Sequence, residues 1–168
     1  MTIHFARLKV GFPAPRKHPP DWAGCWKVYT ICATSSSGSS TTLSDVNSLE
    51  SEKDKSDARK TYVTLLGKAH TGEDFRALYD EKKCHEAHSF GYVTGNGQID
   101  EIKIWRIWGS GKIRMYFLYL PGKRIVMLKT LAKRANKLDT SQSKALEALA
   151  SDVLDSLQQG TFESREIL

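Results

Sequence analysis

Ten lysine and arginine side chains lie in the forty residues from Gln98 to Lys137, where only two acids accompany them. Several of these cations interrupt apolar runs instead of flanking them. Side chains alternate between the two faces of a strand, so a cation inside a strand needs a solvated face or an anionic partner. A phosphate backbone is one such partner. The stretch is therefore a candidate for binding a nucleic acid.

The same stretch predicts an antiparallel meander. Runs rich in Ile, Val, Tyr, Phe and Trp predict strands at 101–108, 112–120 and 124–131, and short glycine-containing turns connect them. In the middle strand one face carries Ile113, Met115, Phe117 and Tyr119, and the other carries Lys112, Arg114 and Tyr116. We expect the first face to pack under helices and the second to meet a phosphate backbone, with aromatic rings available to stack on bases. A solvated face with scattered charges is the alternative.

The first third of the chain predicts little regular structure. Residues 1–21 form either an N-terminal arm or an extra strand, and prolines at their end stop any regular element. The apolar run over 22–33 predicts a strand. The polar run TSSSGSSTT and the charged run after it predict a loop over 34–54, of which 34–42 is either a disordered connection or a mobile flap. A single domain over 22–160 agrees with the usual domain length of roughly 100–150 residues.

Two helices are expected before the meander. Apolar residues recur at helical spacing over 55–70. Thr71 can cap a second helix that ends near Lys83, and the two would form a helical hairpin on one face of the sheet. Residues 89–98 contain three glycines and predict a loop or an irregular hairpin.

One helix is expected after the meander. Asp139, Thr140 or Ser141 can cap a helix that runs to about Gln158, and it either shields the basic sheet or packs beside it. Residues 161–168 predict a flexible tail. The predicted fold class is α+β.

The composition favours an anionic partner and a cytoplasmic location. The formal net charge is +6 and the isoelectric point is near 9.2. The sequence contains no apolar run long enough to span a membrane and no secretory N-terminal pattern, so no membrane partner is expected. The cysteines and histidines predict neither disulfides nor a metal site. Three cysteines without CxxC spacing do not predict a disulfide framework. His85 and His88 lack further ligands nearby, so we predict no metal and no cofactor.

The segment from Gln98 to Leu157 resembles the phage-type HigB toxins of the RelE/ParE/HigB superfamily, over a little more than a third of the chain. Ile104-Trp105-Arg106 stands where those toxins have a strand that ends in leucine and arginine. Residues 113–117 (IRMYF) match their "yRvfY" strand, and Lys133-Arg134 matches the lysine pair before their last helix.

The resemblance implies a RelE-like antiparallel sheet, with a helical hairpin on one face and a C-terminal helix. It also implies the toxin of a toxin–antitoxin system that cleaves messenger RNA at the ribosome by attack of the ribose 2′-hydroxyl. Its partners would be messenger RNA, the ribosome and a cognate antitoxin that is acidic or binds DNA. Such an endoribonuclease (an mRNA interferase) inhibits translation and growth.

The resemblance also assigns roles to basic residues. Arg114 would hold the scissile phosphate, and Arg134 or Lys133 would stabilise or protonate the leaving oxygen. Lys103 and Arg106 would position the backbone or assist deprotonation. The remaining candidates for RNA contact are Lys112, Tyr116, Lys129 and Lys137.

One departure from the family leaves alternatives open. Many family ribonucleases carry a Tyr or His soon after the final basic pair, and residues 135–139 contain neither. Tyr116, Tyr119, His85 and His88 are candidate replacements. Two other functions are compatible with the sequence: a ParE-like inhibitor of DNA gyrase, and a basic nucleic-acid-binding protein without catalytic activity.

Overall fold

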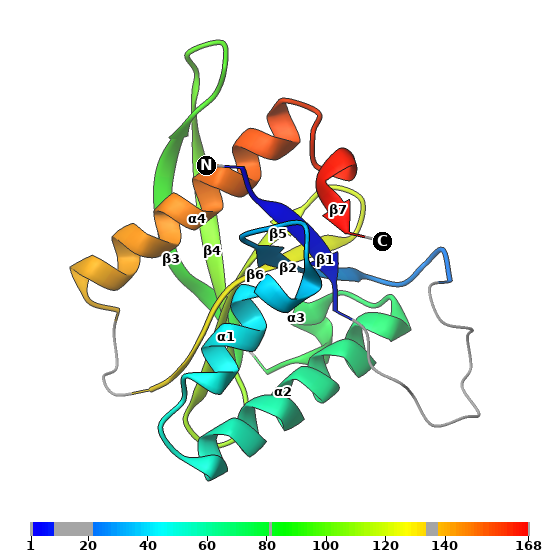
Figure 1. The fold of residues 1–168 in the computed structure, drawn as a ribbon, viewed down its shortest axis with the longest axis vertical. Coiled ribbons are helices and arrows are strands. Elements are labelled where there is room, and N and C mark those ends of the chain that lie inside the picture. The colour runs from blue at the N-terminus through cyan, green and yellow to red at the C-terminus, as the bar shows by residue number, and fades with distance from the viewer. Residues whose placement is uncertain (1, 9–21, 81, 134–137, 168) are drawn as a thin grey trace.

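A computed structural model of the protein describes residues 2–8, 22–80, 82–133 and 138–167. Seven strands in this part of the chain form one mixed sheet with the order β3-β4-β5-β6-β2-β1-β7 (Figure 1). The strands are β1 (His4–Arg7), β2 (Lys27–Cys32), β3 (Cys84–Val93), β4 (Ile99–Trp108), β5 (Ile113–Leu120), β6 (Arg124–Ala132) and β7 (Glu166–Ile167). The α+β class is confirmed, and so are the three meander strands and the strand within 22–33.

The sheet is larger than predicted, and it is not wholly antiparallel. Strands β2 and β6 pair in parallel, as do β1 and β7. The N-terminal segment was expected to be an arm or an extra strand, and β1 is such an extra strand. Of the two alternatives for 89–98, the irregular hairpin is present: β3 runs to Val93, pairs antiparallel with β4 with a register shift between Glu86 and His88, and is joined to it by residues 94–98. Strand β3 lies at an edge of the sheet and is only partly buried, so its sequence lacks a strong apolar alternation.

The described helices are α1 (Thr41–Asn47), α2 (Glu52–Thr71), α3 (Phe75–Leu78) and α4 (Thr140–Gln158). The loop predicted over 34–54 was wrong at 41–47 and at 52–54, which are α-helical, because two serines of the segment are helix N-caps. Ser40 accepts the Leu43 amide at the start of α1, and Ser51 accepts the Asp54 amide at the start of α2. The predicted helical hairpin is reduced, since α3 is a single turn capped by Asp74.

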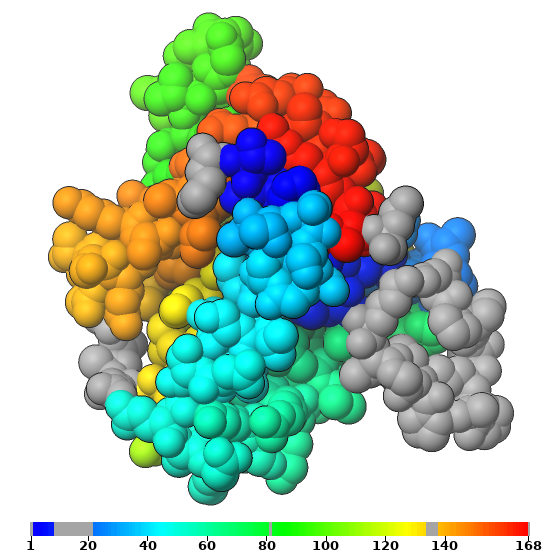
Figure 2. All heavy atoms as spheres, viewed as in Figure 1, coloured from blue at the N-terminus to red at the C-terminus, as the bar shows by residue number. Residues whose placement is uncertain are grey.

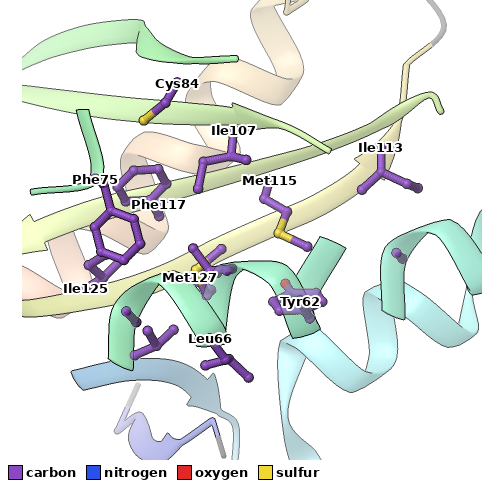
Figure 3. Close-up of a cluster of buried hydrophobic side chains, with 14 of the residues drawn as sticks. Tyr62, Leu66, Phe75, Cys84, Ile107, Ile113, Met115, Phe117, Ile125 and Met127 are labelled. Atoms are coloured by element: carbon purple, nitrogen blue, oxygen red, sulfur yellow. The ribbon is translucent and has the colours of Figure 1, made fainter. Parts of the chain in front are cut away.

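The two faces of the sheet bury separate clusters. Helix α2 places Tyr62 and Leu66 against Met115 and Met127, with Phe75 of α3 beside Phe117 (Figure 3). Helix α4 packs on the opposite face, where its apolar stripe meets β4, β5 and β6. The last helix was expected either to shield the basic sheet or to pack beside it. It shields part of the sheet, because α4 covers part of the face that carries Arg114 and Tyr116.

Helix α4 begins where the sequence predicted. Asp139 accepts the Gln142 amide at 2.7 Å, and the Gln142 side chain accepts the Asp139 amide in a capping box. Two polar contacts tie the helix to β3: His88 to Glu147 at 2.7 Å and Tyr92 to Asp155 at 2.6 Å. None of the described helices is both long and apolar enough to cross a membrane. All three cysteines are free and buried.

The predicted flexible tail is part of the fold over 161–167. Phe162 is 1% exposed and stacks on Phe5 of β1 with ring centroids 4.1 Å apart. Strand β7 then pairs with β1. A single buried aromatic side chain in a polar segment gives no periodic signal, which is why the sequence pattern missed it.

We expect Phe162→Ala to lower the free energy of unfolding by about 3–5 kcal/mol, because it removes a fully buried ring and leaves a cavity. The exposed neighbour Gln159 provides the control, and Gln159→Ala should change stability by less than about 0.5 kcal/mol. Urea unfolding followed by circular dichroism measures both values. Equal stability of Phe162→Ala and the parent protein would contradict the placement of this ring.

Candidate nucleic-acid interface

The register of the meander aligns four polar side chains across four strands. His85 of β3 pairs with Arg106 of β4, Arg106 with Tyr116 of β5, and Tyr116 with Lys129 of β6. Cross-strand partners share a face, so these side chains form one row on the face that carries α4. In the next row, Trp108 pairs with Arg114. The sheet thus gathers cations and aromatic rings that are far apart in sequence.

A cavity of about 530 Å³, here called the basic groove, lies over this part of the sheet. Its walls are the α1–α2 segment and the first turn of α4. In Figure 2, atoms of the last meander strands (yellow) are visible between the start of α4 (orange) and α1 (cyan). The charged and phenolic lining residues are Asp45, Glu50, Asp54, Arg106, Lys112, Arg114, Tyr116, Lys129, Lys133 and Asp139.

Two arginines that line this groove, Arg106 and Arg114, have buried donor groups. Arg114 is 3% exposed, lies 4.4 Å from the Trp108 ring centroid and donates from Nη1 to the Ile113 carbonyl at 3.1 Å. The Nε–H groups of Arg106 and Arg114 are both buried, and neither has an acceptor in the part of the chain that the structure describes. Burial, and then the Arg106 charge, lower the pKa of Arg114. Buried donors without acceptors are costly, so this pair is suited to an anionic ligand.

His85 fixes one of these guanidinium groups. Its Nε2 atom lies 2.6 Å from Nη2 of Arg106, and its Nδ1 atom lies 2.7 Å from the Glu86 carbonyl oxygen. A guanidinium only donates and a carbonyl only accepts, so Nδ1 carries the proton and Nε2 accepts. His85 therefore orients Arg106 and does not line the groove itself.

Tyr116 stands between the two arginines as a protonated phenol. It is 4% exposed, and burial raises the pKa of its hydroxyl. The charge of Arg106, a hydrogen bond with Arg106 and the charge of Arg114 oppose this shift. At neutral pH the phenol keeps its proton and can donate it to a ligand in the groove.

Helix α1 closes the groove on the β6 side. Asp45 accepts from Nζ of Lys129 at 2.9 Å and from the backbone amide of Thr130, also at 2.9 Å. Strand β6 pairs with β2 only up to Met127, and beyond that point Asp45 supplies an acceptor for the Thr130 amide. Asp139 is likewise engaged as the cap of α4. The α1–α2 segment also contributes exposed Glu50 and half-buried Asp54 to the lining.

The structure brings most of the predicted site residues together. Six of them line the groove: Arg106, Lys112, Arg114, Tyr116, Lys129 and Lys133. Arg134 and Lys137 lie outside the described residues.

The prediction that Lys103 acts beside Arg106 was wrong. The two residues are three positions apart in one strand, so their side chains point to opposite faces. Lys103 instead pairs with Glu86 at 2.9 Å. This hydrogen bond and the Glu86 charge raise the pKa of Lys103, whereas a lysine base needs a lowered pKa.

Two other candidates are also placed elsewhere. His88 contacts Glu147 of α4, and Tyr119 lies on the α2 face of the sheet. The lining acids Asp45 and Asp54 were missed, because no local pattern connects α1 and α2 with groove residues that are fifty or more positions away in the sequence. In the described part of the chain, no group of three or more His, Cys, Asp or Glu side chains could hold a metal ion.

Comparison of the chain with protein-family models, curated proteins and solved structures finds no match. The function is therefore inferred from the chemistry of the groove.

We expect His85 to adopt the Nδ1–H tautomer whenever its ring is neutral, because its two neighbours impose that arrangement. Imidazole ¹⁵N chemical shifts distinguish the two tautomers, and His85→Gln assigns the signal. Dominance of the Nε2–H form, which is unable to accept from Arg106, would contradict the described geometry.

Proposed function

We propose that the basic groove binds a single strand of RNA and cleaves it, and that the protein is a toxin of the RelE/HigB kind. The observation that supports this proposal most strongly is the pair of arginines, Arg106 and Arg114, whose buried Nε–H donors lack acceptors among the described residues. Arginine is well suited to phosphate because its planar fork offers parallel donors. The cavity of about 530 Å³ is also large enough for a nucleotide, since small-molecule sites span roughly 300–1,000 Å³.

The chemistry proposed for the groove is transesterification. The ribose 2′-oxygen forms a bond to the adjacent phosphorus, and the bond from phosphorus to the 5′-oxygen breaks. The products are a 2′,3′-cyclic phosphate and a 5′-hydroxyl. Arg106 and Arg114 would stabilise the additional negative charge on the phosphate oxygens in the transition state.

Two proton transfers complete the reaction. A carboxylate of the α1–α2 wall, Glu50 or Asp54, would take the proton of the 2′-hydroxyl as the general base. Tyr116, whose raised pKa keeps it protonated, would give its proton to the leaving 5′-oxygen. These assignments replace the Tyr or His that the resemblance leads one to expect after the last basic pair.

The order of the secondary-structure elements supports this proposal. From Lys27 onward, the chain orders its elements as a strand, helices, an antiparallel meander and a final helix. This is the order expected for a RelE-like toxin, to which β1, β3 and β7 would be additions. Under this proposal, the partners are messenger RNA, the ribosome and an antitoxin that neutralises the protein in the cytoplasm.

We expect brief expression of the protein in bacteria to create new 5′ ends within translated messenger RNA. Arg106→Gln and Arg114→Gln should each reduce cleavage at least about 100-fold, the effect typical of removing a donor to the transition-state charge. Sequencing of RNA 5′ ends measures this.

Lys103→Gln is the matched control for this experiment. It removes a cation from the same strand as Arg106 but from the opposite face, and should leave the cuts unchanged. Cleavage that survives both arginine substitutions at normal protein levels would refute the proposed site. Growth arrest with intact RNA would instead indicate a target such as DNA gyrase.

One observation favours a second candidate, a nucleic-acid-binding protein that does not cleave. The groove lining contains no histidine among the described residues, and Tyr116 is almost fully buried. This candidate predicts RNA binding that Arg106→Gln weakens, with a salt dependence reduced by about 0.7 in log–log slope for each lost phosphate contact. No new RNA ends would then accompany the binding.

A further inference from the structure

A second cavity, here called the tryptophan pocket, lies at another place on the sheet. Its volume is about 440 Å³, and its lining residues are Trp26, Gly72, Asp74, Arg76, Trp105, Tyr119, Leu120 and Lys123. Trp26 and Trp105 each contact Tyr119 edge-on, with ring centroids 5.7 Å and 5.4 Å apart. All three rings are only half-buried. Three large aromatic surfaces thus border one open cavity.

The pocket is separate from the basic groove. Trp105 and Tyr119 lie on the face that packs against α2 and α3, whereas Arg106 and Tyr116 lie on the α4 face. The two cavities share no lining residue. The pocket therefore needs an explanation of its own.

Hydrogen bonds hold the wall formed by Trp26 in place. Its backbone amide donates to the Ala69 carbonyl, and its indole Nε1 donates to the Glu73 carbonyl, both at 2.9 Å. Its ring also packs edge-on against Phe75, with centroids 5.3 Å apart. An indole fixed at both ends loses little entropy when a ligand stacks on it.

The charges around the pocket favour an anion. Arg76 lies 5.5 Å from the Trp105 ring centroid and 3.5 Å from Asp74. Lys123 donates to the carbonyls of Gly24 and Gly72 and has a third N–H to offer. Two cations and one carboxylate make the lining unfavourable for a cationic ligand, although aromatic rings alone would accept one.

We propose that the tryptophan pocket binds a nucleotide, with the base stacked on an indole and the phosphate held by Arg76 and Lys123. Flat aromatic surfaces beside cations are the elements that bind single-stranded nucleic acid, and they tolerate any base. The proposed site goes beyond the cleavage function and does not depend on it. The nucleotide can be free or part of a strand.

The test uses ¹⁵N-labelled full-length protein and the signals of its four indole N–H groups. The probes are adenosine monophosphate and a 2′-O-methyl tetra-adenylate, which 2′-hydroxyl attack cannot cleave. We expect the indole signals of Trp26 and Trp105 to shift saturably with the monophosphate, and to shift equally in Arg106→Gln, in which phosphate binding at the basic groove is weakened. The Trp108 signal reports on the groove separately, because Arg114 lies over that ring. Similar affinity for both probes would indicate a free nucleotide, and tighter binding of the tetra-adenylate would indicate a strand.

Substitutions separate this site from incidental binding. Trp105→Leu keeps an apolar side chain but removes the stacking surface, and should weaken binding about tenfold. Arg76→Gln should weaken binding of the monophosphate more than binding of adenosine. Arg59→Gln, at an exposed position on α2, is the matched control and should have no effect.

Two results would overturn the inference: no saturable shift of the Trp26 or Trp105 signal with either probe, or unchanged affinity in Trp105→Leu. Failure of RNA cleavage in cells would leave it intact, because the groove variants Arg106→Gln and Arg114→Gln should still bind the monophosphate at the pocket.

Discussion

The side chains of Arg106 and Arg114 carry like charges on neighbouring strands and have buried donors, so the residues around them must compensate these charges and donors. Removing an arginine from water is costly unless its charge and donors are compensated. The Trp108 ring covers one guanidinium, and the His85 imidazole accepts from the other. Neither contact satisfies the Nε–H donors. The described side chains thus compensate the pair only in part, which leaves the groove ready for an anion.

The two faces of the sheet differ in what they carry: one is covered by an apolar cluster, and the other carries both a second cluster and the basic groove. On one face, α2 and α3 bury a continuous apolar cluster from Tyr62 to Met127. On the other, α4 buries a second cluster but begins only at Thr140, and the basic groove extends from its first turn to α1. The Asp45 carboxylate has a structural contact and a groove contact: it accepts the Thr130 amide of β6, and it pairs with the Lys129 ammonium. The consequence is a groove with arginines on its floor and acids on its walls.

The sequence predicted features whose cause is local. Strands β4 to β6 follow from runs rich in β-branched and aromatic residues between short turns, and the start of α4 follows from the Asp139 cap. The serine-rich segment was misjudged, because low complexity concealed Ser40 and Ser51 as caps of real helices. Lys103 was grouped with Arg106 by charge, although their spacing in a strand already separates them. The contact of His85 with Arg106, and the approach of Asp45 to Lys129, depend on register and tertiary packing, which no local pattern encodes.

The most direct measurement is a crystal structure of the protein with a 2′-O-methyl oligonucleotide, which retains every phosphate but cannot be cleaved by 2′-hydroxyl attack. If the basic groove binds RNA as proposed, one phosphate will lie within hydrogen-bond distance of Arg106 and Arg114, with the adjacent ribose facing Glu50 or Asp54. An oligonucleotide bound elsewhere, with the groove empty or closed by the protein's own side chains, would contradict the proposed interface.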